Sequence, residues 1–243
     1  MEIKLLHLYH DIMSLYGDWA NVALLRRHLE ELGNTVTVEK ASFGGGADIA
    51  GADFLFIGAG TERSQKAVLE DFRQYGEAVS QAAQDGKPML FTGTSFEMLG
   101  REITDAAGVR FPGIGLMDFT VQETAQRIVG DVYGPCAFAD DTIVGFMNKC
   151  SHIAGVETPL LSQCEMGFGN EAEHGPEGLC FQNVLGTHLT GPVLVKNPPL
   201  VRALIRAIYQ QKAEPVPTER PAYPYEEQGY EVTLSELRKR MGQ

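Results

Sequence analysis

The stretch KPMLFTGTSFEMLG, residues 87–100, decides the fold of this chain. Its apolar run Met89–Thr92 predicts a buried strand, and the residues that follow predict a tight turn at Gly93-Thr94-Ser95 and a helix from about Phe96. A strand that runs into a helix through a very short turn presents that turn at the ligand-binding edge of an open α/β sheet. The tip of this turn is Gly93, which offers no side chain for a reaction.

Length and composition favour one α/β domain followed by a tail. The chain has 243 residues, and 44% of them are hydrophobic, which is enough for a full core. We expect the domain to span residues 1–213. The Pro/Tyr-rich segment 214–243 is expected to be an extended tail that ends in a short helix, Thr233–Met241, capped by Thr233. Docking on the domain is the favoured position of this tail, and contact with a partner is the alternative. No run of about 18 or more apolar residues is present, so no membrane insertion is predicted.

Charge and cysteine content exclude several function classes. The net charge of −12 argues against nucleic acid and anionic membranes as partners. The opening residues MEIKLLHLYHD predict a first strand and not a signal peptide. The four cysteines have no CxxC spacing and accompany no histidine pair at metal-ligand spacing. We therefore expect a cytoplasmic protein with no metal and no cofactor.

The remaining pattern alternates strands with helices, which predicts a mainly parallel sheet wound in the Rossmann or flavodoxin manner. Thr35–Lys40 alternates β-branched and polar residues and is expected near an edge, whereas Asp53–Ile57 is expected to be fully buried. The other expected strands are Ile3–Tyr9, Arg127–Tyr133, Thr142–Asn148 and one within Gly178–Asn183. The expected helices follow residues 16–21, lie within 64–84 and span 198–213.

Two further groups are candidate ligand contacts. Gly58-Ala59-Gly60 ends a buried strand, and glycines there let backbone N–H groups face a ligand, although most such pairs are only turns. Arg127 carries a planar guanidinium that pairs bidentately with a carboxylate, and its alternative is a surface arginine at the start of a strand. The residues alone favour the plainer alternatives, a turn for the glycines and a surface position for Arg127.

Two stretches carry a resemblance to a known family. Residues 87–100 resemble the nucleophile turn of class I glutamine amidotransferases of the cobyric-acid-synthase-like branch, above all the glutaminase subunits of lipid II isoglutaminyl synthase. That family has Cys-Gly-Gly-Tyr-Gln, an apolar residue and Leu-Gly, so that Gly93 falls on the Cys and Glu97 on the Gln. Val184–Pro192, VLGTHLTGP, resembles the family's Leu-Gly-Thr-Tyr-Leu-His-Gly-Pro, with His188 on the Tyr and Thr190 on the catalytic His.

The resemblance implies a three-layer α/β domain with a mainly parallel sheet and helices on both faces. It places Gly58, Ala59 and Gly60 in an oxyanion loop, where Ala59 replaces a glycine, a small change unless the backbone needs positive φ. It also implies that Thr94 and Arg127 contact a glutamine-like ligand. The family passes ammonia to a Mur-ligase-like (MurT-type) synthetase partner that amidates lipid II in peptidoglycan synthesis.

Glutamine hydrolysis needs a thiolate, an imidazole that activates it, and N–H groups for the oxyanion. Gly93 cannot supply the first, nor Thr190 the second, so we expect a degenerate binding or regulatory subunit. The alternatives are a working glutaminase of the family type and a hydrolase with a rebuilt site that uses Ser95 or Cys150 with His188. The plainer interpretations are a packed, hydrogen-bonded His188 and a buried, unreactive Cys150.

Overall fold

Sheet A, which carries the predicted turn, has six strands in the order β2-β1-β3-β4-β10-β9. In this computed structural model, which describes residues 1–218 and 221–242, the first five strands of that order run parallel and β9 pairs antiparallel with β10. The strands are β1 (Glu2–Leu8), β2 (Thr35–Ala41), β3 (Phe54–Ile57), β4 (Met89–Thr92), β9 (Leu179–Phe181) and β10 (Val184–Thr187). The predicted edge position of β2 and the buried β3 and β4 are confirmed.

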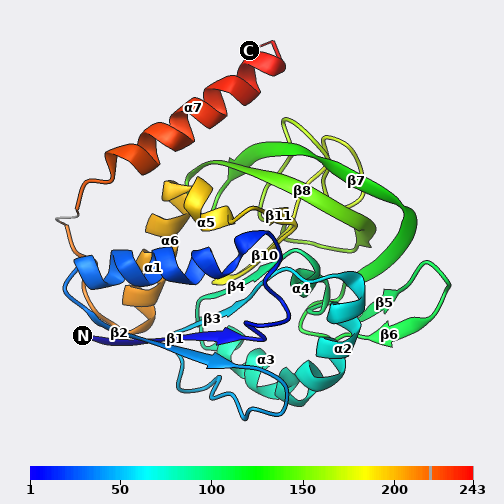
Figure 1. Cartoon of the computed structure of the whole chain (residues 1–243), viewed down its shortest axis with the longest axis horizontal. Coiled ribbons are helices and arrows are strands. Elements are labelled where there is room, and N and C mark those ends of the chain that lie inside the picture. Colours follow the sequence, from blue (N-terminus) through cyan, green and yellow to red (C-terminus); the bar gives the residue numbers. More distant parts are fainter. Residues whose placement is uncertain (219–220, 243) are drawn as a thin grey trace.

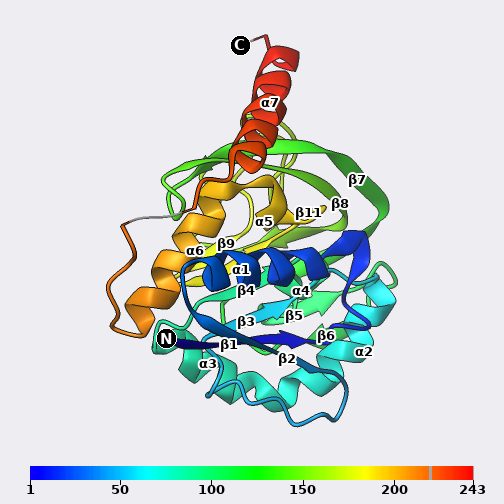
Figure 2. The ribbon, with the colours of Figure 1, turned by 60° about the vertical axis from the view of Figure 1, so that its left-hand side comes forward.

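Helices cover both faces of sheet A, and this arrangement confirms the predicted three layers. Figures 1 and 2 show α1 (Trp19–Glu31) and α6 (Pro198–Gln211) on one face and α2 (Glu62–Phe72) and α3 (Gly76–Gln84) on the other. Alternate residues of each strand point to opposite faces, so successive residues of β3 enter different cores. Phe54 and Phe56 belong to the core between sheet A and the helices α1 and α6. Leu55 and Ile57 belong to the core between the sheet and the helices α2 and α3. A strand buried on both faces therefore has a continuous apolar sequence.

Sheet B has five strands in the order β11-β8-β7-β5-β6, and its centre is the long antiparallel hairpin β7–β8. The strands are β5 (Glu102–Thr104), β6 (Arg110–Pro112), β7 (Thr120–Cys136), β8 (Asp141–Ala154) and β11 (Leu189–Thr190). The two hairpin strands are much longer than the predicted ones, because half-exposed strands contain many polar residues that hide their strand pattern. The register shifts between Glu123 and Ile128, a bulge that contains Arg127.

The helical segments also differ in length from the expectation. The predicted 64–84 helix is two helices, α2 and α3, separated by a 3₁₀ turn at Arg73–Tyr75. The helix after the central turn, α4, contains only Thr94–Glu97 and begins two residues before Phe96. A further short helix, α5 (Val193–Lys196), precedes α6.

The tail docks on the domain through a helix that is longer than expected. This helix, α7, spans Pro224–Arg240, and Thr233 lies inside it, where its Oγ1 donates to the Gly229 carbonyl at 2.7 Å instead of capping a new helix. Tyr230, Leu234 and Leu237 are buried in a small cluster with β7 and β8. The far end of α7 extends away from the rest of the molecule (Figure 1).

The start of the tail is held against α1. The Tyr223 ring stacks on His28 with ring centroids 3.9 Å apart, and its hydroxyl donates to Glu31 at 2.5 Å. Arg27 forms an ion pair with Glu226. Within residues 1–218 and 221–242, no helix combines the length and the apolar character needed to cross a membrane.

We predict that Leu234→Ala lowers the free energy of unfolding by about 2 kcal/mol, because it removes a buried side chain from the contact between α7 and the β7–β8 hairpin. Val232→Ala on the same helix is the matched control, since Val232 is 57% exposed, and it should leave stability nearly unchanged. Urea unfolding of the full chain measures both. Equal effects of the two substitutions would contradict the docking described here.

Candidate functional site

A cavity of about 240 Å³ lies at the carboxyl ends of β3, β4 and β10, beside the β7–β8 hairpin. The structure brings most of the candidate residues together around it, although they come from distant parts of the chain. Those that line it are Ala59, Gly60, Gly93, Thr94, Arg127, Cys150, His188 and Thr190. Gly58 and Ser95 lie outside its lining.

The turn at Gly93 has the sharp geometry of a strand-to-helix elbow. Gly93 has φ 60° and ψ −133°, a conformation that is strained for residues other than glycine. Its N–H donates to the Thr187 carbonyl of β10 at 2.8 Å, which fixes the turn against the neighbouring strand. An ideal Cβ at this position would lie 2.6 Å from the Cβ of Ala59. The space in which a side chain of residue 93 would begin is therefore filled by the Ala59 methyl group.

The buried carboxylate of Asp18 ties the loop after β3 to the end of β4. Its Oδ2 accepts from the Ala59 N–H at 2.7 Å and from the Thr92 hydroxyl at 2.6 Å. Burial raises the pKa of Asp18, and these hydrogen bonds act in the opposite direction. The Gly60 N–H donates to the Thr94 hydroxyl at 3.1 Å. The N–H groups of Ala59 and Gly60 thus already have acceptors within the protein.

The two candidate hydroxyl groups are also engaged in structural bonds. Thr190 Oγ1 donates to the Phe146 carbonyl at 2.9 Å, next to the pairing of β11 with β8. Ser95 is fully buried, and its Oγ lies 2.8 Å from both the Ile57 and the Thr92 carbonyl oxygens. The structure does not bring Ser95 to His188, so it gives Ser95 no base.

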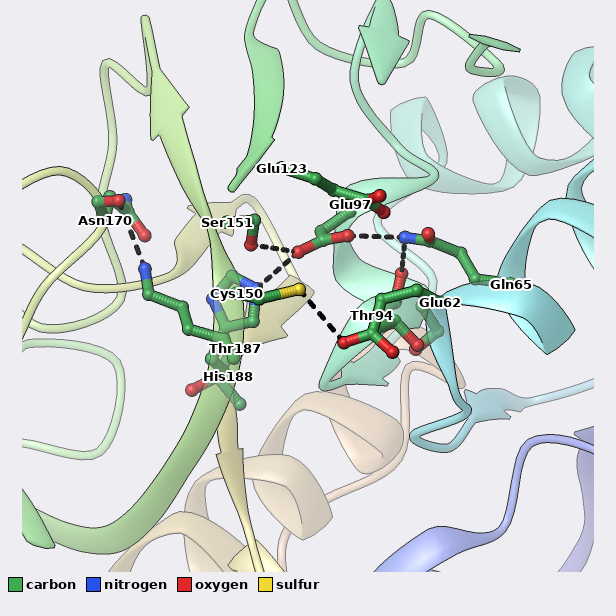
Figure 3. Close-up of polar contacts among 12 residues, drawn as sticks. Glu62, Gln65, Thr94, Glu97, Glu123, Cys150, Ser151, Asn170, Thr187 and His188 are labelled. Carbon is green, nitrogen blue, oxygen red and sulfur yellow. Dashed lines mark hydrogen bonds and ion pairs between the residues drawn. The ribbon is translucent and has the colours of Figure 1, made fainter. Parts of the chain in front are cut away.

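Glu97 is the centre of a buried polar network on the cavity wall (Figure 3). Its Oε1 accepts from His188 Nε2 at 3.0 Å and from the Ser151 hydroxyl, and its Oε2 accepts from Gln65 Nε2 at 2.5 Å. Burial acts to raise the pKa of Glu97, but the hydrogen bonds from His188, Ser151 and Gln65 stabilise the carboxylate and lower its pKa below the usual value. Glu97 is therefore ionised.

The His188 ring is an anchored part of this network. Burial and the nearby Lys149 ammonium lower the pKa of His188, which leaves a neutral ring that donates Nε2–H to Glu97. In the part of the chain that the structure describes, its Nδ1 has no hydrogen-bond partner. The arrangement matches a packed, hydrogen-bonded histidine rather than a base beside a nucleophile.

Cys150 bonds to a carboxylate and not to an imidazole. Its thiol donates to Glu62 Oε1 at 3.0 Å (Figure 3), and burial followed by this bond raises the pKa of Cys150 to about 12. A thiol with such a pKa holds almost no thiolate at neutral pH. Its neighbour His152 bonds through Nδ1 to the Glu171 carbonyl at 3.1 Å. The geometry thus forms no Cys–His pair here.

Three acidic residues that sequence reasoning had not singled out as site residues shape this region. Asp18 precedes α1 within the stretch YGDWAN, and Glu62 is the first residue of α2. Glu177 is fully buried next to His188. Its carboxylate accepts from the Thr187 hydroxyl at 2.8 Å and from the backbone N–H of His188 at 2.7 Å. Burial raises the pKa of Glu177 to about 7. Their sequence signals are weak because single acidic residues are common throughout the exposed parts of proteins.

No metal site is evident among residues 1–218 and 221–242: no group of three or more His, Cys, Asp or Glu side chains is placed to hold an ion. Arg127, which the resemblance made a candidate ligand contact, lies on the cavity wall. Its two terminal nitrogens donate to Glu62 at 2.7 Å and to Asn148 at 3.0 Å.

Comparison with solved structures places this fold among the glutamine amidotransferases. A crystal structure of a glutamine amidotransferase matches with a TM-score of 0.53 at 15% identity, over 84% of this chain and 98% of that chain. The PurLQS structure from Thermotoga maritima matches with a TM-score of 0.51 at 11% identity, over 87% of this chain and 97% of that chain. At these identities the likeness concerns the fold alone.

Sequence comparison gives the family. A model of the CobB/CobQ-like glutamine amidotransferase domain matches residues 4–198. The chain belongs to this family. It is 30% identical over 214 residues to the GatD subunit of the glutamine-hydrolyzing lipid II isoglutaminyl synthase of Streptococcus pneumoniae, covering 87% of this chain and 82% of the relative. The GatD subunit of Staphylococcus aureus is 29% identical over 220 residues, covering 88% of this chain and 87% of the relative.

We predict that Gly93→Ala destabilises the protein by about 3 kcal/mol, because the new methyl group meets Ala59 in a strained backbone conformation. Adding Ala59→Gly should recover part of that loss, although Ala59→Gly alone should cost stability. Urea unfolding of the wild type, both single variants and the double variant measures the coupling. Purely additive effects would show that the two positions do not compete for space.

A second prediction concerns the buried Glu177. A folded pKa of about 7, above the unfolded value of 4.5, gives stability that is complete below the unfolded pKa and is lost as pH rises through the folded pKa. Glu177→Gln should lack this loss, so its unfolding free energy relative to wild type should rise by up to roughly 3 kcal/mol between about pH 5 and pH 8. Exposed Glu157, changed to Gln, is the control. Parallel pH curves for Glu177→Gln and wild type would refute the assignment.

Proposed function

We propose that this chain is a glutamine amidotransferase-like subunit that has lost glutaminase activity and acts as a small-molecule-binding or regulatory subunit. The contact between Ala59 and Gly93 carries the proposal. A nucleophile on the elbow needs a side chain at residue 93, and that side chain would begin 2.6 Å from the Ala59 methyl carbon. Residue 93 therefore has no nucleophilic side chain, and the Ala59 methyl group fills the space that such a side chain would need.

A general base and an oxyanion donor, which glutamine hydrolysis also needs, are missing as well. Thr190 stands at the position of the general base in the resemblance, and its hydroxyl is bound to a backbone carbonyl. The Ala59 N–H donates to Asp18 and is not available to an oxyanion. Loss of a nucleophile alone costs a hydrolase on the order of 10⁶ in rate. Three separate losses in one cavity support a binding role over a slow enzyme.

A hydrolase with a rebuilt site is less well supported. Such a site needs a hydroxyl or thiol within hydrogen-bonding reach of a base. Ser95 is buried against two carbonyl groups, and Cys150 has a raised pKa beside Glu62. His188 donates to Glu97 and so faces neither of them as a base.

The proposal includes a synthetase partner in the cytoplasm. The named relatives are subunits of lipid II isoglutaminyl synthase, and a Mur-ligase-like (MurT-type) subunit is the partner that this kinship suggests for peptidoglycan synthesis. Tyr16 and Trp19 support a docked partner because they are 45% and 60% exposed, and exposed aromatic residues are enriched at interfaces. The four free cysteines fit a reducing compartment.

We predict that the purified protein releases no ammonia from L-glutamine above the rate of a heat-denatured sample, with or without a synthetase partner. An ammonia-coupled assay with glutamate dehydrogenase measures this directly. Sustained, enzyme-dependent ammonia release would overturn the loss of glutaminase activity.

The same assay tests the steric argument. Gly93→Cys with Thr190→His should remain inactive, because the cysteine has no room beside Ala59. The triple variant that adds Ala59→Gly should be the first to show hydrolysis or reaction with a thiol reagent at residue 93. If the double variant is as active as the triple variant, Ala59 is not the obstacle.

A further inference from the structure

The wall of the cavity contains an ion pair between Arg127 and Glu62. Arg127, in the β7 bulge, directs one terminal nitrogen to Glu62 Oε1 at 2.7 Å and the other to Asn148 Oδ1 at 3.0 Å. The Cys150 thiol donates to the same Glu62 oxygen at 3.0 Å. A guanidinium group is the protein's best receptor for a carboxylate, and here a carboxylate of the chain itself occupies it.

Glu62 is held in this position by its own helix. It is the first residue of α2, directly after Thr61, whose side chain caps the helix by accepting from the Ser64 N–H at 3.0 Å. A negative charge in the first turn of a helix is favourable because it meets the positive end of the helix dipole. Moving the Glu62 carboxylate away from Arg127 would therefore also weaken its favourable interaction with the N-terminus of α2.

The other charges at the cavity are matched as well. Glu123 pairs with Lys66, and Glu97 accepts from His188. The ammonium of Lys149 donates to the backbone carbonyls of Gly169 and Asn170 at 2.7 and 3.1 Å. Among the lining residues that the structure describes, no cationic side chain is left without an acceptor. An anionic ligand would thus lose its hydration without gaining a counter-ion.

We propose that Glu62 is an internal counter-ion that occupies the carboxylate-binding position of Arg127, so that the cavity accepts small uncharged polar molecules of the amide class and rejects carboxylates. This inference rests on the proposed binding role of the cavity. In this inference, Glu62 is the residue that decides whether the cavity binds neutral amides or carboxylates. Free amino acids, which all carry a carboxylate, fall in the rejected class.

Three molecules of one shape test this selection: glutaramide, glutaramate and glutarate, which carry none, one and two carboxylates. Isothermal titration of the full-length wild type should give the affinity order glutaramide, glutaramate, glutarate. Glu62→Ala should reverse the order and tighten glutarate binding by at least about tenfold, because Arg127 then lacks its internal partner. Glu62→Gln, which keeps the shape without the charge, should fall between the two.

Two further variants locate the effect. Arg127→Met added to Glu62→Ala should abolish the gain in glutarate binding. Glu70→Ala removes the same charge from an exposed position of α2 and should behave as wild type. Circular dichroism and the Tm identify any variant that does not fold. If wild type binds glutarate or L-glutamine as tightly as folded Glu62→Ala, the inference is wrong, whereas the loss of hydrolysis is judged separately by ammonia release.

Discussion

The parallel pairing of β3 with β4 is the constraint on which the site depends. The register sets Ile57 opposite Phe91, and the same register carried two residues further sets Ala59 opposite Gly93. The loop and the turn are thus forced together by the sheet itself, and Asp18 fastens them by bonding to both Ala59 and Thr92. Any side chain added at residue 93 must compete with residue 59, because neither strand end can move without breaking a buried ladder.

The polar groups around this contact are bonded within the protein. A catalytic site keeps donors and acceptors unsatisfied until substrate arrives, and this costs stability. Here the loop N–H groups, the hydroxyl of Thr190 and the carboxylate of Glu97 have partners within the protein. Glu97 and His188 bond to each other, and Ser151 and Gln65 donate to the same carboxylate. These buried polar groups therefore satisfy one another within the protein.

The sequence predicted the strands and turns whose local residue pattern agrees with their position in the folded protein. Met89–Thr92 was predicted to be a buried strand because its first three residues are apolar, and the glycine after it was predicted to be in a turn. Sequence reasoning failed where the outcome depends on distant residues. The lengths of β7 and β8 are set by their pairing, and Tyr230, Leu234 and Leu237 of α7 pack on the hairpin, a contact between segments far apart in the sequence. Ala59 was expected to be a small change unless its backbone needed positive φ. Its φ is not positive, but its methyl group lies where a side chain of residue 93 would begin.

The backbone conformation of Gly93 can be explained by the fold, without reference to a reaction. The turn keeps φ 60° and ψ −133° although no nucleophile stands on it. Strain at this position is usually explained by the need to expose a reactive side chain. In this protein the conformation follows from geometry alone: the Gly93 N–H must reach the Thr187 carbonyl of β10 while the chain turns into α4. A glycine adopts that conformation at little cost, so the elbow persists as a structural joint between β4, β10 and the helix that carries Glu97.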